Sequence, residues 1–297
     1  MRKDSVPRRH VQKSKGSASS ALKSRPSNGP LSKATLSRRV HRHLLGLGFS
    51  KNGSGYFVSD PSKQKIRDLH SAQRHENLEE HRAFVEAHAQ DLIQNFATGR
   101  QVDPTSIQPE LVEVASESAE SRLFRLACLL WSVPVSEGFG RRLRFLVRDK
   151  SKGCLIGLFA LGDPVFNLSA RDNWVGWTHQ DRCERLVHVM DAYVMGALPP
   201  YSQLIGGKLV AALIGSNEVK AAYERKYLGL RGVISRSENR ARLVLLTTTS
   251  ALGRSSVYNR LVIPNGPAFK SIGVTKGFGH FHLSGSIFEM MRQYLES

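Results

Sequence analysis

A loop with two prolines and two adjacent glycines joins a strand-like run to a short helical run in the second half of the chain. A strand, a stiff loop and a new helix N-terminus place unpaired backbone N–H groups and the positive end of the helix dipole at one point. A phosphate group binds well at such a point. The residues that we assign to this ligand site are Gln203, Gly206, Gly207 and Lys208.

The order of elements around this loop is hairpin, strand, glycine turn, helix, strand, helix, strand, which resembles the Gcn5-related N-acetyltransferase fold. In that fold the helix after a central strand cradles the pyrophosphate of acetyl-coenzyme A. Its motif is Gln or Arg, two residues, Gly, one residue, then Gly or Ala. Gln203 and Gly206 fit this motif, whereas Lys208 stands in place of the small last residue and brings a cation that can pair with phosphate.

The same resemblance implies an acyl transfer with acetyl-coenzyme A as the cofactor. Asp191 on the strand is then the candidate general base, Tyr258 the candidate general acid, and Tyr201 lines the substrate cleft. A simpler interpretation stays open for both catalytic residues. A strand aspartate commonly serves as a hydrogen-bonded structural group, and a tyrosine at helical spacing commonly packs in the core.

A nuclease or another metal enzyme is the competing enzymatic interpretation. Its ligands would be Asp163, Asp191, His280 and His282. His280 and His282 are two residues apart, so on a strand both rings face the same side, as a metal pair requires. Aromatic residues and glycine around the two histidines fit a tight turn equally well.

Positive charge is concentrated at the start of the chain. The first 43 residues contain twelve Lys or Arg and one acid, and so carry +11 of the total formal charge of +18. Residues 1–31 combine these charges with Ser, Pro and Gly and lack aromatic side chains, so we expect a disordered basic arm. Such an arm suits nucleic acid, because contacts with phosphates release counterions. A solubilising tail without a dedicated partner is the alternative.

The rest of the sequence predicts an α+β protein. We expect a helical N-terminal module at 32–100, a linker at 101–117 with two prolines, and at 118–297 a mixed, mostly antiparallel sheet with flanking helices. The module begins with a basic amphipathic helix near 36–47, followed by a short strand near 56–58, and this pair is a candidate contact for DNA.

Cysteine content and hydropathy indicate a cytoplasmic protein without a membrane span. The start lacks the apolar segment of a signal peptide, and no stretch approaches the ~20 apolar residues that a span needs. Cys128, Cys154 and Cys183 are odd in number and far apart, so we expect reduced packing residues and no zinc site.

Six segments together resemble one protein family, the DruA family of the Druantia bacterial anti-phage defence system. They are residues 131–134, 140–147, 157–158 with 161–168, 191–194, 199–201 with 206–209, and 277–282. The resemblance implies a setting in anti-phage defence, with other defence proteins as partners, and assigns no reaction. A non-catalytic DNA-binding accessory of a transposable element is the alternative function, in which the glycine turn binds a backbone phosphate.

Overall fold

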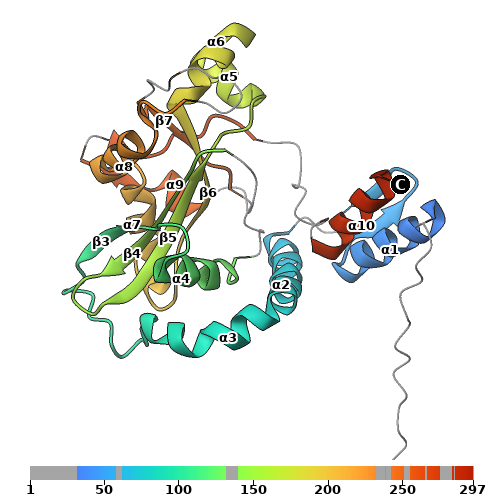
Figure 1. Cartoon of the computed structure of the whole chain (residues 1–297), viewed down its shortest axis with the longest axis horizontal. Coiled ribbons are helices and arrows are strands. Elements are labelled where there is room, and N and C mark those ends of the chain that lie inside the picture. The colour runs from blue at the N-terminus through green and yellow to red at the C-terminus, as the bar shows by residue number, and fades with distance from the viewer. Residues whose placement is uncertain are drawn as a thin grey trace, which may run out of the picture.

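A computed structural model describes residues 32–57, 62–131, 140–231, 238, 242–250, 255–264, 266–274, 283 and 285–296. The basic arm at 1–31 and the pair His280 and His282 lie outside these residues. The described chain forms a five-stranded sheet with helices on both faces, and a smaller unit in which the first and last helices lie side by side (Figure 1).

The sheet is mixed and mostly antiparallel, in the order β3-β4-β5-β6-β7. Its strands are β3 (Pro109–Glu113), β4 (Arg142–Asp149), β5 (Cys154–Gly162), β6 (Val189–Ala197) and β7 (Leu245–Thr247). The first four pair antiparallel, and β7 runs parallel to β6. The predicted α+β class and the predicted hairpin of β4 and β5 are therefore confirmed.

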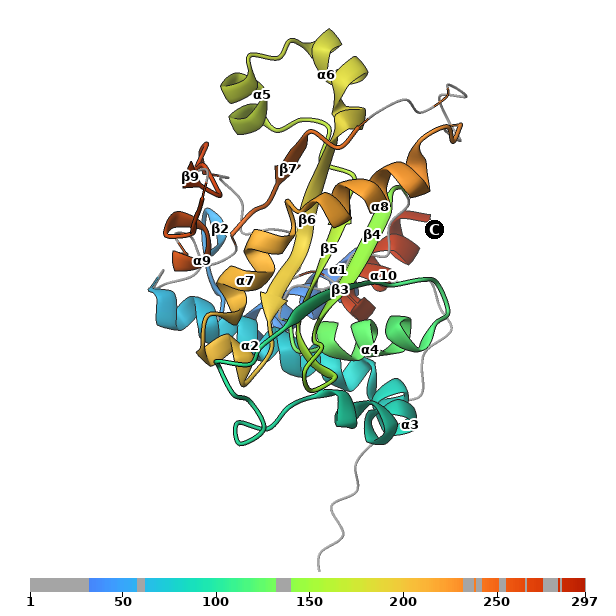
Figure 2. The same ribbon diagram turned by 90° about the vertical axis from the view of Figure 1, so that its left-hand side faces the viewer.

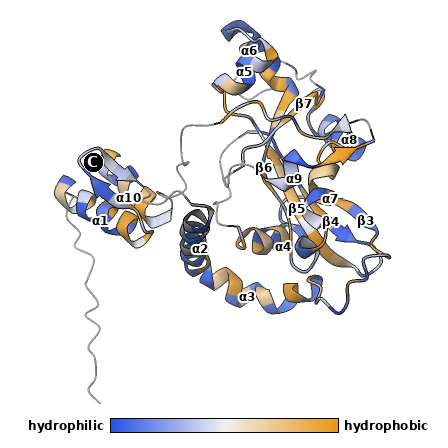
Figure 3. Cartoon of the chain, turned by 180° about the vertical axis from the view of Figure 1, so that it is seen from behind, coloured by the Kyte–Doolittle hydropathy of each residue, from blue (hydrophilic) through white to orange (hydrophobic). Residues whose placement is uncertain are grey.

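Strand β5 organises the core, because all nine of its residues are buried. Helices α7 (Gly206–Leu213) and α8 (Asn217–Tyr227) pack on one face of the sheet. Helix α4 (Ala119–Cys128) packs on the other face (Figure 2). Leu92, at the end of α3 (Arg82–Leu92), packs against the same hydrophobic cluster. Hydropathy colouring marks β5 and β6 as hydrophobic (Figure 3). A strand covered on both faces reads as a continuous apolar run, as the sequence of β5 does.

Short helices and turns complete this domain. They are α5 (Ser169–Val175), α6 (His179–Arg185), α9 (Ser256–Asn259), the single 3-10 turns Ile93–Asn95, Leu186–His188 and Tyr201–Gln203, and the hairpin of β8 (Val262–Ile263) and β9 (Gly266–Pro267). Thr178 and Asp181 form a reciprocal capping box at the start of α6. Thr178 with Asp181 in the sequence predicts a capping box for a short helix at about 179–186, and the structure confirms it.

The smaller unit joins both ends of the described chain. It consists of α1 (Lys33–Gly46), the hairpin β1 (Ser50–Asn52) and β2 (Gly55–Phe57), and α10 (Gly285–Glu296). Leu44, Leu47 and Phe49 form its small core. Helix α2 (Lys63–Glu80) connects it to the sheet domain, and Glu80 accepts a hydrogen bond from the N–H of Ser286 at the start of α10 (3.2 Å) (Figure 1).

The expected linker at 101–117 contains a strand of the sheet. β3 pairs with β4 along its whole length, from Pro109 opposite Asp149 to Glu113 opposite Phe145. The sequence did not show this strand, because its apolar alternation is short and a proline opens it. A proline is tolerated there because β3 is an edge strand.

Three other expectations on local structure need correction. The sequence predicts a long helical region at 62–98 that breaks near Asn77, whereas the break lies at His81. The sequence predicts a strand near 272–276, but residues 272–274 are irregular, and residues 275–276 lie outside the described residues. Cys128 and Cys154 are buried as expected, but Cys183 is exposed on α6. No helix in the described part of the chain combines the length and apolar content that a bilayer crossing needs.

Gly157 of β5 determines how closely α7 packs on the sheet. A Cβ added there would lie 2.8 Å from Cγ2 of Val210 and would collide with the carbonyl oxygen of Gly196. We predict that Gly157→Ala lowers the free energy of unfolding by about 1–3 kcal/mol, measured by urea denaturation. The control is Gly215→Ala, where a Cβ meets no atom within 4 Å. Equal stability of the two variants would contradict this packing argument.

Candidate functional site

The paired glycines open helix α7, where the sequence predicted a turn into a helix. The N–H groups of Lys208 and Leu209 both donate to the carbonyl of Ile205, at 2.9 and 3.0 Å. The N–H groups of Gly206 and Gly207 have no acceptor among the described residues. No side chain caps the helix. Two donors and the positive end of the helix dipole are therefore available to an anion.

The two glycines differ in how much space surrounds them, which the sequence did not reveal. A Cβ on Gly206 would lie 2.6 Å from the carbonyl oxygen of Tyr201 and 3.1 Å from Cβ of Ala197. A Cβ on Gly207 would lie 3.4 Å from Cγ2 of Val257 on α9, which is ordinary contact. Gly206 is thus required by the fold, whereas Gly207 tolerates a side chain. Gln203 is exposed, and Lys208 is partly buried on the first turn of α7.

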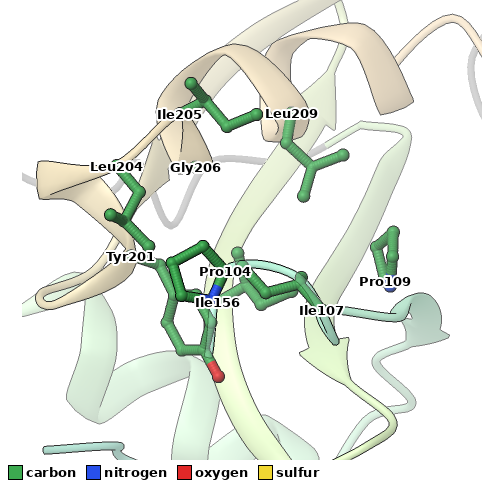
Figure 4. Close-up of a pocket in the computed structure, with 9 residues that line it drawn as sticks. All are labelled: Pro104, Ile107, Pro109, Ile156, Tyr201, Leu204, Ile205, Gly206 and Leu209. Atoms are coloured by element: carbon green, nitrogen blue, oxygen red, sulfur yellow. The ribbon is translucent and has the colours of Figure 1, made fainter. Parts of the chain in front are cut away.

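A largely apolar cavity of about 460 Å³ adjoins the start of α7 (Figure 4). The loop before α7 and its first turns form one side, and the segment 104–109 forms another. The lining residues are Pro104, Ile107, Pro109, Ile156, Tyr201, Leu204, Ile205, Gly206 and Leu209. The volume lies in the range of small-molecule sites, which are roughly 300–1,000 Å³.

Tyr201 forms part of the cavity wall, and its hydroxyl is fixed by a buried carboxylate. The hydroxyl donates to Oδ2 of Asp149 at 2.9 Å, and both residues are almost fully buried. Asp149 also accepts hydrogen bonds from the N–H of Gln108 (3.1 Å) and from the hydroxyl of Ser151 (2.8 Å). One carboxylate therefore holds together the β4–β5 turn, the segment before β3 and the loop before α7.

These hydrogen bonds determine the protonation states of Asp149 and Tyr201. Burial alone would raise the pKa of Asp149, but the donors from Gln108, Ser151 and Tyr201 together outweigh burial and lower that pKa. Burial and the neighbouring Asp149 carboxylate raise the pKa of Tyr201. Tyr201 is therefore protonated at neutral pH, and its hydroxyl donates the hydrogen bond that holds the loop before α7 to Asp149.

Asp191 and Tyr258 are joined to neighbouring threonines at the end of β7. The hydroxyl of Thr247 donates to Oδ1 of Asp191 at 2.6 Å, and Tyr258 is hydrogen-bonded to Thr248. Burial raises the pKa of Asp191, and the Thr247 bond and the charge of Arg171 offset this only in part. Burial likewise raises the pKa of Tyr258. Asp191 thus lies on β6 and Tyr258 on α9, and their hydrogen-bond partners Thr247 and Thr248 are adjacent residues at the end of β7.

Comparison with known proteins identifies the family. The family model described as "Druantia protein DruA" matches residues 60–297. The chain belongs to the DruA family. A relative, the Druantia protein DruA of Escherichia coli (strain UMEA 4076-1), is 50% identical over 266 residues, which are 89% of this chain and 66% of the relative. The chain thus spans about two thirds of that relative's length. No solved structure matches the chain significantly.

The DruA match includes the whole sheet, the cavity and the start of α7. It also includes Asp163 and Asp191, the two carboxylates of the alternative metal-enzyme interpretation. Both accept hydrogen bonds from protein groups. Asp163 accepts from the N–H of Arg141 (2.9 Å) and from its Nε (2.6 Å), and Asp191 accepts from Thr247. Within the described ranges, no three His, Cys, Asp or Glu side chains group together as metal ligands would.

Sequence patterns missed two buried polar clusters of this DruA-family chain. One cluster is Asp149 with its hydrogen-bond donors. The turn at 149–153, Asp-Lys-Ser-Lys-Gly, was a usable signal for it, because an aspartate at the start of a turn accepts hydrogen bonds from the following N–H groups. The other is the fully buried Arg171, which donates to the carbonyls of Val165 and Phe166, each at 2.8 Å, and pairs with Asp172. No periodicity marks this second cluster.

We predict that Asp149→Asn lowers the free energy of unfolding by about 1–3 kcal/mol at pH 7, because an amide replaces a buried acceptor of several hydrogen bonds. The folded-state pKa is lowered, so this stabilisation is complete above the unfolded value of about 3.9 and disappears as the pH falls through the folded pKa. Urea denaturation from neutral to acidic pH should show the two proteins converging. Asp91→Asn, on an exposed residue, is the control.

Proposed function

We propose that this protein serves anti-phage defence as a component of a Druantia system. Membership of the DruA family supports the proposal, as does the relative named Druantia protein DruA. Other proteins of the system are then its partners. We further propose that the sheet domain binds an acyl-coenzyme A in the manner of an acetyltransferase. The N–H groups of Gly206 and Gly207 have no acceptor among the described residues and lie beside an apolar cavity, and this observation carries the second step.

The pairing of β6 and β7 supports the acetyltransferase-like topology. The two parallel strands pair only from Val189 opposite Leu245 to Asp191 opposite Thr247. Beyond Asp191 this edge of β6 has no strand partner in the described part of the chain. An extended pantetheine arm hydrogen-bonds readily to a free strand edge. Asp191 lies six residues before the end of β6, where the loop to α7 begins. This spacing corresponds to about 20 Å along the strand.

Each candidate residue then has a defined task. The N–H groups of Gly206 and Gly207 donate to the pyrophosphate, and Lys208 adds a cation on the same turn. The cavity buries an apolar part of the ligand. When bound, the coenzyme supplies an activated acyl group. Asp191 accepts the proton of the attacking nucleophile, and Tyr258 donates a proton to the departing thiolate.

We predict saturable binding of acetyl-coenzyme A to the full chain by isothermal titration calorimetry. Gly207→Asp should weaken it about tenfold or more, because the new carboxylate competes with phosphate for the same donors while suiting the helix N-terminus. The matched control is Gly207→Ala, which the space at Gly207 permits. Gly206 is unsuitable, since any side chain there meets the Tyr201 carbonyl.

Two results would overturn the coenzyme proposal. One is the absence of binding at millimolar ligand by the folded wild type. The other is equal affinity of Gly207→Asp and Gly207→Ala. Either result leaves the assignment to a Druantia system untouched, because that rests on the family match.

The second candidate function is a non-catalytic DNA-binding accessory protein. The charge of residues 1–31 favours it, since this segment holds eight Lys or Arg and one acid. In that case the α7 start holds a backbone phosphate, and no coenzyme binds.

Deleting residues 1–31 tests the contribution of the arm. We predict a shallower dependence of DNA affinity on salt, by roughly 0.9 in the log–log slope for each phosphate that the arm neutralises in the full chain. Fluorescence anisotropy over a salt series measures the slope, and far-UV circular dichroism checks that the fold is kept. An unchanged slope would refute nucleic-acid binding by the arm.

A further inference from the structure

Helix α1 presents a row of arginines to solvent without acidic neighbours in its own segment. Arg38, Arg39 and Arg42 are all exposed. Residues 32–57, which form α1 and the β1–β2 hairpin, contain five Lys or Arg and no Asp or Glu. Any carboxylate within the chain that pairs with these arginines must therefore come from another segment.

The packed neighbours of α1 do not supply those carboxylates. On α10, Glu289 and Glu296 both pair with Arg292 of the same helix, at 2.6 and 2.8 Å. On α2, Glu76 lies 3.5 Å from His43. Arg39 contacts the sulfur of Met290 on α10. Across the described residues, no carboxylate oxygen lies within 4.0 Å of the guanidinium of Arg38, Arg39 or Arg42.

This arrangement is unfavourable for α1 by itself. Arg38 and Arg42 are four residues apart, so their like charges repel on one side of the helix. Lys33 occupies the first turn, where the helix dipole disfavours a cation. A helix of 14 residues is also marginal in isolation. An anion from outside the chain reduces both the repulsion between the two arginines and the unfavourable interaction of Lys33 with the helix dipole. A polar helix without charges would have neither of these unfavourable interactions.

The rest of the small unit holds this helix in place. His41 Nδ1 and the hydroxyl of Tyr56 on the hairpin are hydrogen-bonded at 2.8 Å. Lys51 of the hairpin lies over the Tyr56 ring, 5.5 Å from its centroid, and adds an exposed cation. Helix α10 packs along α1, so that the C-terminal helix supports the N-terminal one (Figure 1).

We infer that the exposed face of α1 binds the phosphodiester backbone of duplex DNA, with Lys51 of the hairpin binding a further phosphate. A helix of 14 residues is about 21 Å long and, with side chains, about as wide as the major groove. Phe49 is buried and the Tyr56 ring packs on His41, so neither is presented for stacking on unpaired bases. The coenzyme site plays no part in this binding.

The test is the affinity of full-length Arg38→Glu/Arg42→Glu protein for a labelled DNA duplex, measured by fluorescence anisotropy. We expect a loss of about tenfold or more relative to wild type at moderate salt. The matched control is Arg100→Glu/Lys152→Glu, which makes the same change in net charge on two exposed residues outside the small unit. The control should lose clearly less affinity.

One further double variant guards against a folding defect in the small unit. Arg38→Gln/Arg42→Gln keeps good helix formers and removes only the charges. It should lower the slope of log affinity against log salt by roughly 0.9 for each phosphate that the two arginines neutralise. Single-stranded DNA and duplex RNA of equal length are the comparison ligands. Equal duplex affinity of the Gln variant and wild type, equal losses in the Glu variant and its control, or a preference for single strands would each overturn the inference.

Discussion

Strand β5 lies at the centre of the sheet with all nine residues buried, so both of its faces must be covered by helices. Gly157 allows α7 to approach one face closely, and α4 covers the other. Because α7 is fixed against β5, its N-terminus is fixed beside the end of β6. The position of the N–H groups of Gly206 and Gly207 therefore follows from core packing.

The loop that leads into α7 has a second constraint. Asp149 is buried, and a buried carboxylate is tolerated only when its oxygens are hydrogen-bonded. Its donors come from three places in the sequence, Gln108, Ser151 and Tyr201, so the carboxylate ties the wall of the cavity to the β4–β5 turn. A rigid wall around a small apolar cavity is a suitable frame for a ligand site.

The two proposed binding surfaces differ in the physical basis of their affinity. The site at α7 offers a few directed donors next to an apolar cavity, which favours a small ligand with one anionic group. The face of α1 offers several exposed cations, which favours an extended polyanion and depends strongly on salt. Helix α2 connects the two units, and Glu80 at its end caps α10. The two proposals thus assign nucleic acid and a small ligand to separate units of the chain.

Local sequence determined the features that depend on neighbouring residues. The apolar run of β5, the capping box at Thr178, the α+β class and the glycine turn before α7 were all predicted, because periodicity, caps and turns act over a few positions. Tertiary structure decided the rest. Pro109 opens an edge strand because β4 lies beside it, Tyr201 is fixed because Asp149 is folded against it, and α1 is supported by α10 from the far end of the chain. Contacts between residues so distant in sequence leave no local pattern, since they arise only when the packed core brings the segments together.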